Sequence, residues 1–301
     1  MKVPRSMLAA VLLAMSGSLA LAAAGPAAKP RSHATKAVAK VAAAASAAAP
    51  ADKESAPAAG PRAVRLVCID AGHGGAVEGA TGWAGLKEKD VALDVALRTG
   101  RALEAAGYAV VYTRDADVDV DLYERPVIAN RAGADLFVSI HANAEAGHTA
   151  AGFETFYLSS DAGDKTARKL AARENAAAAA AAGAPGLASG ALGLILADLA
   201  VAEARADSAH LATAVQFQLA DVLDTDNRGV KQAPLAVLAG ATMAAVLVEV
   251  GFITSKTEGR LLALPKYRDA IAAAIARGVA RYDEMTSPRL EGAPRDSLSM
   301  R

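Results

Sequence analysis

The sequence has little of what disulfide-stapled scaffolds and nucleic-acid-binding proteins need. Cys68 is the single cysteine among 301 residues, so no internal disulfide can form and the fold must depend on a buried core. Only 4% of the residues are aromatic, and 32 basic residues balance 32 acidic ones. Because proteins that track phosphates usually carry a basic face, this balance argues against nucleic acid as a partner. The hydrophobic residues, 53% of the chain, suffice for a sizeable core of Ala, Val and Leu.

The N-terminal region has the pattern of a secretory signal followed by a tether. A basic start precedes an apolar stretch at 7–15 that is too short to span a bilayer, and a small-residue cleavage site follows at 20–22. We therefore expect a signal peptide at 1–22, with an uncleaved anchor as the alternative, and a periplasmic or secreted protein with no stable membrane insertion. Residues 23–62 are rich in Ala, Pro, Lys and Ser, which predicts a flexible linker.

From about residue 63 the sequence alternates apolar runs with helical stripes. The expected strands are 64–70, 108–113, 135–140, 152–158, 235–238 and 244–250, and the expected helices are 88–106, 123–132, 165–182, 192–223 and 267–282. Such alternation favours an α/β fold with a mostly parallel sheet that is buried on both faces. We expect one catalytic domain at 63–285 and a disordered tail at 286–301.

Two of the five histidines, His73 and His141, directly follow expected strands. The carboxyl ends of strands in an open α/β sheet share one edge, where ligands collect. Glu88 begins the helix after the first of these strands, and two imidazoles with one carboxylate suit a hydrolytic zinc that keeps a position open for water. Glu249 lies in an apolar strand, where a carboxylate is costly to bury, and it is the candidate proton shuttle.

Each of these residues also has an ordinary structural interpretation. A histidine after a strand often satisfies loop hydrogen bonds. Glu88 could favour the helix start through the macrodipole, and Glu249 could be a buried ion-pair partner. Spacing alone therefore leaves both a metal hydrolase and a structural set of residues open.

At these residues the chain resembles the zinc-dependent N-acetylmuramoyl-L-alanine amidase family of bacterial envelopes and spores. The matching segments, in the family's order, are Ile69–Gly75 (IDAGHGG), 85–91 (GLKEKDV), 113–115 (TRD), 124–125 (ER), 129–144 (ANRAGADLFVSIHANA) and 248–254 (VEVGFIT). The resemblance implies one Zn²⁺ per chain held by His73, Glu88 and His141, with Glu249 as the catalytic carboxylate. It implies a twisted, mostly parallel sheet flanked by helices on both faces. It also implies hydrolysis of the amide between N-acetylmuramic acid and L-Ala of the peptidoglycan stem peptide, in wall remodelling or cell separation.

Three further residues are candidates with open alternatives. Asn143 is expected to support the metal or to polarise the substrate, unless it is a turn residue with local bonds. Arg114 is expected to meet the substrate or to hold a loop. The segment 175–207 resembles a cover that some envelope members carry, and Glu203 would fill the open zinc position unless it faces solvent. The resemblance further implies an activator protein with an inactive peptidase-like domain.

Two other functions stay open beside the amidase. A catalytically weak peptidoglycan-binding protein of the same fold would lack a ligand or the acid, and neither is missing here. A zinc hydrolase of this fold that acts on another amide would differ in the geometry of its pocket.

Overall fold

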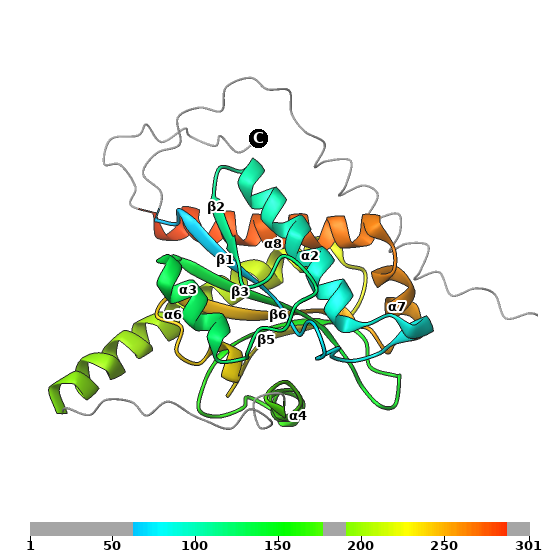
Figure 1. Cartoon of the computed structure of the whole chain (residues 1–301), viewed down its shortest axis with the longest axis horizontal. Coiled ribbons are helices and arrows are strands. Elements are labelled where there is room, and N and C mark those ends of the chain that lie inside the picture. The colour runs from blue at the N-terminus through cyan, green and yellow to red at the C-terminus, as the bar shows by residue number, and fades with distance from the viewer. Residues whose placement is uncertain (1–62, 177–190, 288–301) are drawn as a thin grey trace, which may run out of the picture. The chain divides into compact units, whose positions relative to one another are not determined.

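The structure, a computed structural model, describes residues 63–176 and 191–287, with the backbone alone for 191–203 (Figure 1). The expected signal peptide, linker and all but the start of the expected tail lie outside the described residues. Within the described residues, no helix is both long enough and apolar enough to cross a membrane.

Six strands form one sheet in the order β2-β1-β3-β6-β4-β5. The strands are β1 (Leu66–Ala71), β2 (Ala109–Tyr112), β3 (Leu136–Asn143), β4 (Phe153–Leu158), β5 (Asn227–Ala233) and β6 (Ala244–Phe252). Only the pairing of β4 with β6 is antiparallel. The central strands β3 and β6 are buried along their whole length, which explains their continuous apolar runs. The prediction of an α/β domain with a mostly parallel sheet is confirmed.

Helices cover both faces of this sheet (Figure 1). The helices α2 (Glu88–Ala105), α6 (Ala191–Val222) and α8 (Pro265–Thr286) share one apolar cluster with the sheet. The helices α3 (Glu124–Ala132) and α4 (Lys165–Glu174) share the other, and α7 (Lys256–Leu262) follows β6. Successive strand residues divide between the two clusters, as Phe137 and Val138 of β3 do.

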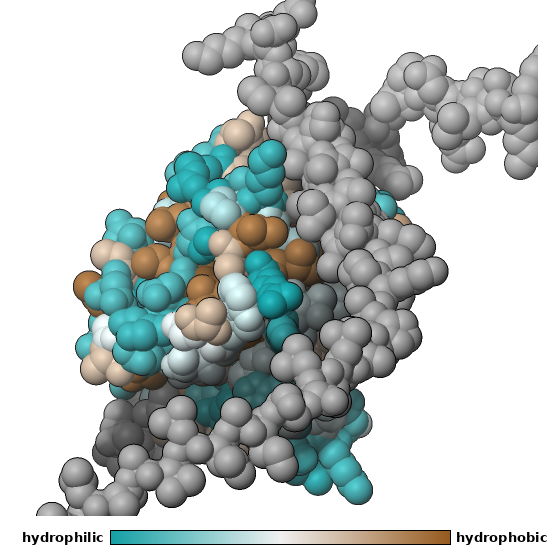
Figure 2. All heavy atoms as spheres, turned by 90° about the vertical axis from the view of Figure 1, so that its right-hand side faces the viewer, coloured by the Kyte–Doolittle hydropathy of each residue, from teal (hydrophilic) through white to brown (hydrophobic). Residues whose placement is uncertain are grey.

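The surface of the described residues carries single apolar side chains among polar ones. Figure 2 shows this mixture on one side of the domain. The large exposed apolar side chains are Val77, Val118, Tyr123, Phe217, Leu264 and Met285. Apolar residues scattered in this way are normal on a protein surface and require no partner.

The expected helix at 165–182 ends at Glu174, and the secondary structure expected between 227 and 238 was also wrong. Residues 235–238 do not form a strand, because η2 (Ala236–Leu238) is a short 3-10 helix with buried apolar side chains. A short apolar run does not distinguish a strand from such a buried turn. The strand of this region is β5, which we missed because its sequence, NRGVKQA, has no apolar run. As the edge strand it is half exposed, and polar residues are tolerated there.

Candidate metal centre and active-site groove

His73 lies in a glycine-rich loop directly after β1. The loop passes so close to β3 that a Cβ atom on Gly72 would lie 2.5 Å from the His141 imidazole. His73 itself has a φ of 59°, in the sparsely populated left-handed region. Arg114 Nη2 donates to the Gly72 carbonyl at 2.8 Å, and Arg125 Nη2 donates to the His73 carbonyl at 2.9 Å. Two buried arginines therefore hold the backbone that carries His73.

A buried ion pair between Asp70 and Arg125 supports this loop. Asp70 accepts hydrogen bonds from Arg125 Nη1 at 2.8 Å, from Thr113 Oγ1 at 2.5 Å and from Ser139 Oγ at 2.6 Å. Burial alone would raise the pKa of Asp70, but the Arg125 guanidinium and the two hydroxyls hold it below its usual value. The position of the His73 loop thus depends on the buried Asp70 carboxylate, which accepts hydrogen bonds at both of its oxygens.

We expect Asp70→Asn to lower the free energy of unfolding at pH 7 by about 3–5 kcal/mol, because the Arg125 charge would be left buried without its partner. The pKa of Asp70 is lower in the folded state, so its contribution is present at neutral pH. It is lost as the pH falls below about 4, and the difference between variant and wild type should shrink over that range. Denaturant unfolding at several pH values measures both effects.

The exposed pair Arg131–Glu124, with its atoms 3.5 Å apart, provides the control for this substitution. Glu124→Gln should cost less than about 1 kcal/mol, as surface ion pairs usually do. An equally small cost for Asp70→Asn would contradict the role given to the buried pair.

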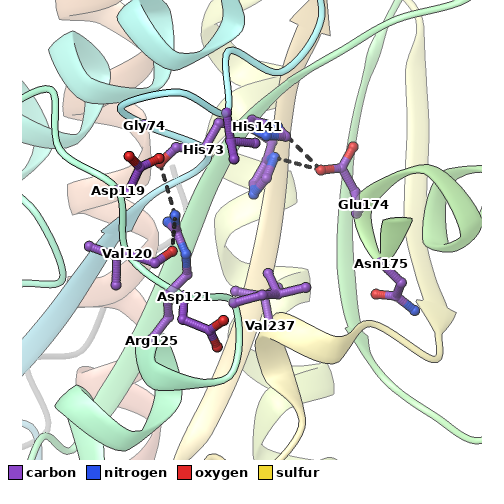
Figure 3. Close-up of a pocket in the computed structure, with 12 residues that line it drawn as sticks. His73, Gly74, Asp119, Val120, Asp121, Arg125, His141, Glu174, Asn175 and Val237 are labelled. Carbon is purple, nitrogen blue, oxygen red and sulfur yellow. Dashed lines mark hydrogen bonds and ion pairs between the residues drawn. The ribbon is translucent and has the colours of Figure 1, made fainter. Parts of the chain in front are cut away.

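Four side chains from separate elements converge beside this loop. His73, Glu88, His141 and Glu174 each offer one ligand atom, and these atoms all lie within 4.8 Å of one another. Glu88 Oε1 is 3.1 Å from both His73 Nε2 and His141 Nδ1. Glu174 Oε2 is 3.3 Å and 3.2 Å from the same two nitrogens. Figure 3 shows the two imidazoles pointing toward the Glu174 carboxylate at the end of α4.

The donor set fits a tetrahedral metal ion. Zinc–ligand distances of about 2.0–2.2 Å place the ligand atoms of a tetrahedron roughly 3.3–3.6 Å apart. The nitrogen–oxygen separations of 3.1–3.3 Å lie close to this value. His73 Nε2 is buried and has no hydrogen bond within the described residues, although two carboxylate oxygens are near it. A shared cation would explain the short separations at His73 Nε2, whereas His141 Nδ1 and Glu88 Oε1 also have hydrogen-bond geometry at 3.1 Å.

The charges of the cluster also call for a cation. Burial alone would lower the pKa of His141, but the facing carboxylates of Glu174 and Glu88 raise it well above its usual value. Burial opposes ionisation of Glu88 too, yet the two imidazoles lower its pKa to about 2. Two carboxylates thus need positive charge at this place, which either protons on the imidazoles or a divalent ion can supply.

Glu249 lies next to this cluster, on β6 directly opposite His141 of β3. Its side chain is fully buried, and its Oε2 has no hydrogen-bond partner in the described part of the chain. Burial raises the pKa of Glu249 well above its usual value, while the Arg173 guanidinium, 3.4 Å from Oε1, acts in the opposite direction. A buried carboxyl group with one unbonded oxygen beside a metal-type cluster is suited to proton transfer.

The structure brings the predicted residues His73, Glu88 and His141 together and places Glu249 beside them. It adds Glu174, which the sequence interpretation missed. The side chain of Glu203, predicted to reach the metal, lies outside the described residues. Glu174 did leave a signal, because it continues the buried stripe of α4, whose other members are Ala167, Leu170 and Ala171. A carboxylate at a stripe position of an amphipathic helix needs a partner or a role.

The other two predicted residues take different positions. Asn143 ends β3 and is buried, and its Oδ1 accepts from Arg173 Nη1 at 3.0 Å while its Nδ2 donates to Glu154 Oε1 at 2.8 Å. Arg114 is buried and directs its donors to backbone carbonyls, which belong to Ala71, Gly72, Lys89 and Ala116. Asn143 therefore contacts Arg173, which pairs with Glu249, whereas Arg114 holds the loop that carries His73.

A cavity of about 300 Å³ opens beside the cluster toward α3. Its lining includes His73, Val120, Asp121, Arg125 and Val237 (Figure 3). The cavity gives the cluster room for part of a ligand on the side of α3.

Known proteins resemble this chain over the whole described domain. The family model described as N-acetylmuramoyl-L-alanine amidase matches residues 67–281. The chain is 37% identical over 219 residues to N-acetylmuramoyl-L-alanine amidase AmiA of Escherichia coli (strain K12), a match that covers 72% of this chain and 76% of that protein. The solved structure of amidase AmiC2 of Nostoc punctiforme is similar with a TM-score of 0.54 and 32% identity, over 72% of this chain and 96% of that one. The CwlD amidase from Clostridioides difficile, solved in complex with the GerS lipoprotein, is similar with a TM-score of 0.56 and 25% identity, over 73% of this chain and 99% of that one.

Proposed function

The chain belongs to the N-acetylmuramoyl-L-alanine amidase family and is a peptidoglycan hydrolase, and from this premise we propose that it is a zinc enzyme. His73, Glu88 and His141 hold the ion, one per chain, and Glu249 transfers the protons. The observation that carries this proposal is the convergence of two imidazoles and two carboxylates within 4.8 Å of one another. They meet at the carboxyl edge of the sheet, beside a buried carboxyl group.

The proposed reaction adds water to the lactyl carbonyl and breaks its bond to the L-Ala nitrogen. When bound, the zinc polarises that carbonyl and makes water a better nucleophile at neutral pH. Glu249 accepts the proton that the attacking water loses and delivers it to the departing nitrogen. Asn143 orients the substrate once α4 has moved away, and Arg114 keeps the His73 loop in place. The products are a muramic acid carboxylate and a stem peptide with a free L-Ala amine.

The proposed resting state is closed by α4. Glu174 stands where a fourth ligand would bind, and a carboxylate at that position displaces the attacking water. The neighbouring Arg173 pairs with Glu249 at 3.4 Å and donates to the Ala144 carbonyl at 2.8 Å. One turn of α4 therefore contacts both the proposed metal ligands and the proposed proton acceptor, Glu249. The contacts support Glu174 in the autoinhibitory role, and for Glu203 that role stays a prediction.

Activation then requires that α4 leaves the groove. A relative is known in complex with a lipoprotein, and we propose an activator protein with an inactive peptidase-like domain for this chain. We further propose that the protein is exported to the periplasm or secreted through the signal at 1–22. The linker at 23–62 would tether the catalytic domain, and the enzyme would serve wall remodelling or cell separation.

Metal removal should abolish hydrolysis of purified sacculi. We expect 1,10-phenanthroline to stop the release of stem peptides that begin with L-Ala, and added Zn²⁺ to restore it. The same treatment should lower the midpoint of thermal unfolding by several degrees, because a ligand that binds only the folded state stabilises it. The Glu174→Ala variant is assayed beside wild type, so that a closed resting state does not hide the activity. Reducing sugars among the products would instead mean cleavage of the glycan and would contradict the proposal.

A further inference from the structure

A row of polar residues crosses the sheet next to the metal cluster. His141 on β3 lies opposite Glu249 on β6, and Glu249 lies opposite Glu154 on β4. Residues directly opposite one another project from the same face of a sheet. This is the face that α4 covers. This row of polar side chains beneath α4 therefore runs from the metal cluster to β4, the strand that pairs with the edge strand β5.

Two cationic side chains of the edge strand β5 pair with Glu154. Its side chain is 2% exposed, and its Oε2 lies 2.7 Å from Lys231 Nζ and 3.1 Å from Arg228 Nε. Its Oε1 accepts from Asn143 Nδ2 at 2.8 Å. Two full positive charges thus meet a single buried carboxylate, which leaves one positive charge to be balanced by another group.

That balancing group comes from the start of α4. Asp164, the N-cap residue of α4, places Oδ2 3.2 Å from Lys231 Nζ, and Thr166 Oγ1 accepts from the same Nζ at 2.8 Å. A cavity of about 400 Å³ opens here, lined by Tyr157, Gly163, Asp164, Arg228, Val230, Lys231 and Gln232. If α4 moves away, Lys231 loses the Asp164 carboxylate, and the positive charge that Glu154 does not balance becomes open to another anion.

The carboxylates at the two ends of α4 are about as far apart as the two ends of a short extended peptide. Asp164 and Glu174 are separated by ten residues, or about 15 Å at 1.5 Å per residue. An extended peptide of four to five residues spans about the same distance. A stem peptide cut at its N-terminal amide carries free carboxylates within that length. One end of α4 thus occupies the metal position, and the other occupies the cation pair.

We propose that Arg228 and Lys231 form a subsite for a carboxylate of the stem peptide, and that Asp164 fills this subsite as an intramolecular substitute. The inference rests on the proposed amidase function of the metal site and adds the part of the substrate that this site selects. The helix α4 then acts as a substrate mimic as well as a plug.

Equilibrium binding tests the subsite without turnover. The probes are the stem tetrapeptide L-Ala-D-Glu-meso-diaminopimelyl-D-Ala and the same peptide with its free carboxyl groups converted to carboxamides. Each is titrated into the zinc-loaded full chain. Asp164→Asn should bind the acidic peptide about tenfold more tightly than wild type, because the internal competitor loses its charge while Asn still caps the helix. Lys231→Met should bind it about tenfold more weakly. Both variants should bind the carboxamide peptide as wild type does.

The opposite directions of the two affinity changes distinguish recognition of a peptide carboxylate from simple anchoring of α4. If the Asp164–Lys231 pair only fastens α4, both substitutions loosen the helix and shift the affinity in the same direction for both peptides, which overturns the subsite. Equal binding of the two peptides, or no binding to any variant at millimolar concentration, overturns it as well. Arg228→Gln serves as a second variant should Lys231→Met unfold, and Lys256→Met, at the exposed start of α7, is the control that should change nothing. Failure to cleave sacculi would instead defeat the proposed function while a preference for the acidic peptide could still be measured.

Discussion

Replacing Glu249 with Gln should lower kcat on purified sacculi by about 10²–10⁴-fold and leave the bound zinc unchanged. The amide has nearly the shape of the carboxyl group, so the packing of β6 should survive. It cannot accept the proton of the attacking water, however, and it cannot return one to the leaving nitrogen. Metal content measured on the same preparation separates these two consequences.

Glu104→Gln, at an exposed position of α2, is the matched control and should leave kcat unchanged. Should Glu249→Gln lose its metal, Glu249 would be a ligand instead of the proton shuttle. Should the variant retain zinc and full activity, the proton must travel by another route, and the proposed chemistry would need a different acid and base.

The positions of His73 and His141 could be predicted because strand topology places them. Both follow buried apolar runs, and parallel strands end at the same edge of a sheet. Their distance along the chain is therefore no obstacle to their meeting in space. Glu88 follows from the same logic, since it starts the helix that returns from that edge. Periodicity and the rule for sheet edges were enough to make these three residues candidates, and the resemblance to the amidase family gave them the role of metal ligands.

Glu174 could not be placed by such reasoning because its helix depends on tertiary packing. Where α4 crosses the sheet is determined by contacts of Ala167, Leu170 and Ala171 with side chains such as Phe156 and Leu247. The short apolar stripe indicates which side of α4 is buried, but it does not indicate what that side faces. The acid in the stripe was the one clue that it faces a charged site.

The edge strand β5 was missed for a related reason. Arg228 and Lys231 interrupt any apolar pattern in its sequence. Their partner Glu154 lies in another strand, so the pairing exists only after β4 and β5 have aligned. Polar residues that satisfy one another across a sheet cannot be distinguished from solvent-exposed ones in the sequence. The candidate peptide subsite therefore became visible only in the structure.

Replacing Glu174 with Ala should raise kcat/KM on sacculi about tenfold or more. A tenfold rise corresponds to the closed state losing roughly 1.4 kcal/mol of stability relative to the open state. The substitution removes the contacts of Glu174 with both imidazoles and the 2.6 Å pairing of its Oε1 with Arg173 Nη2. It thereby frees the fourth metal position and loosens the guanidinium that lies on Glu249. The apolar contacts of α4 remain, so the helix should open more often without unfolding.

Metal content decides how this result is interpreted. The three proposed ligands His73, Glu88 and His141 remain in Glu174→Ala, and three protein ligands are what a catalytic zinc site requires. Zinc should therefore stay bound while activity rises. Arg168→Gln, an exposed change on the same helix, should keep its zinc and leave the activity unchanged. A variant that loses zinc together with activity would make Glu174 a permanent ligand. A variant that keeps zinc but is no faster than wild type would mean that α4 does not restrain the enzyme through this carboxylate.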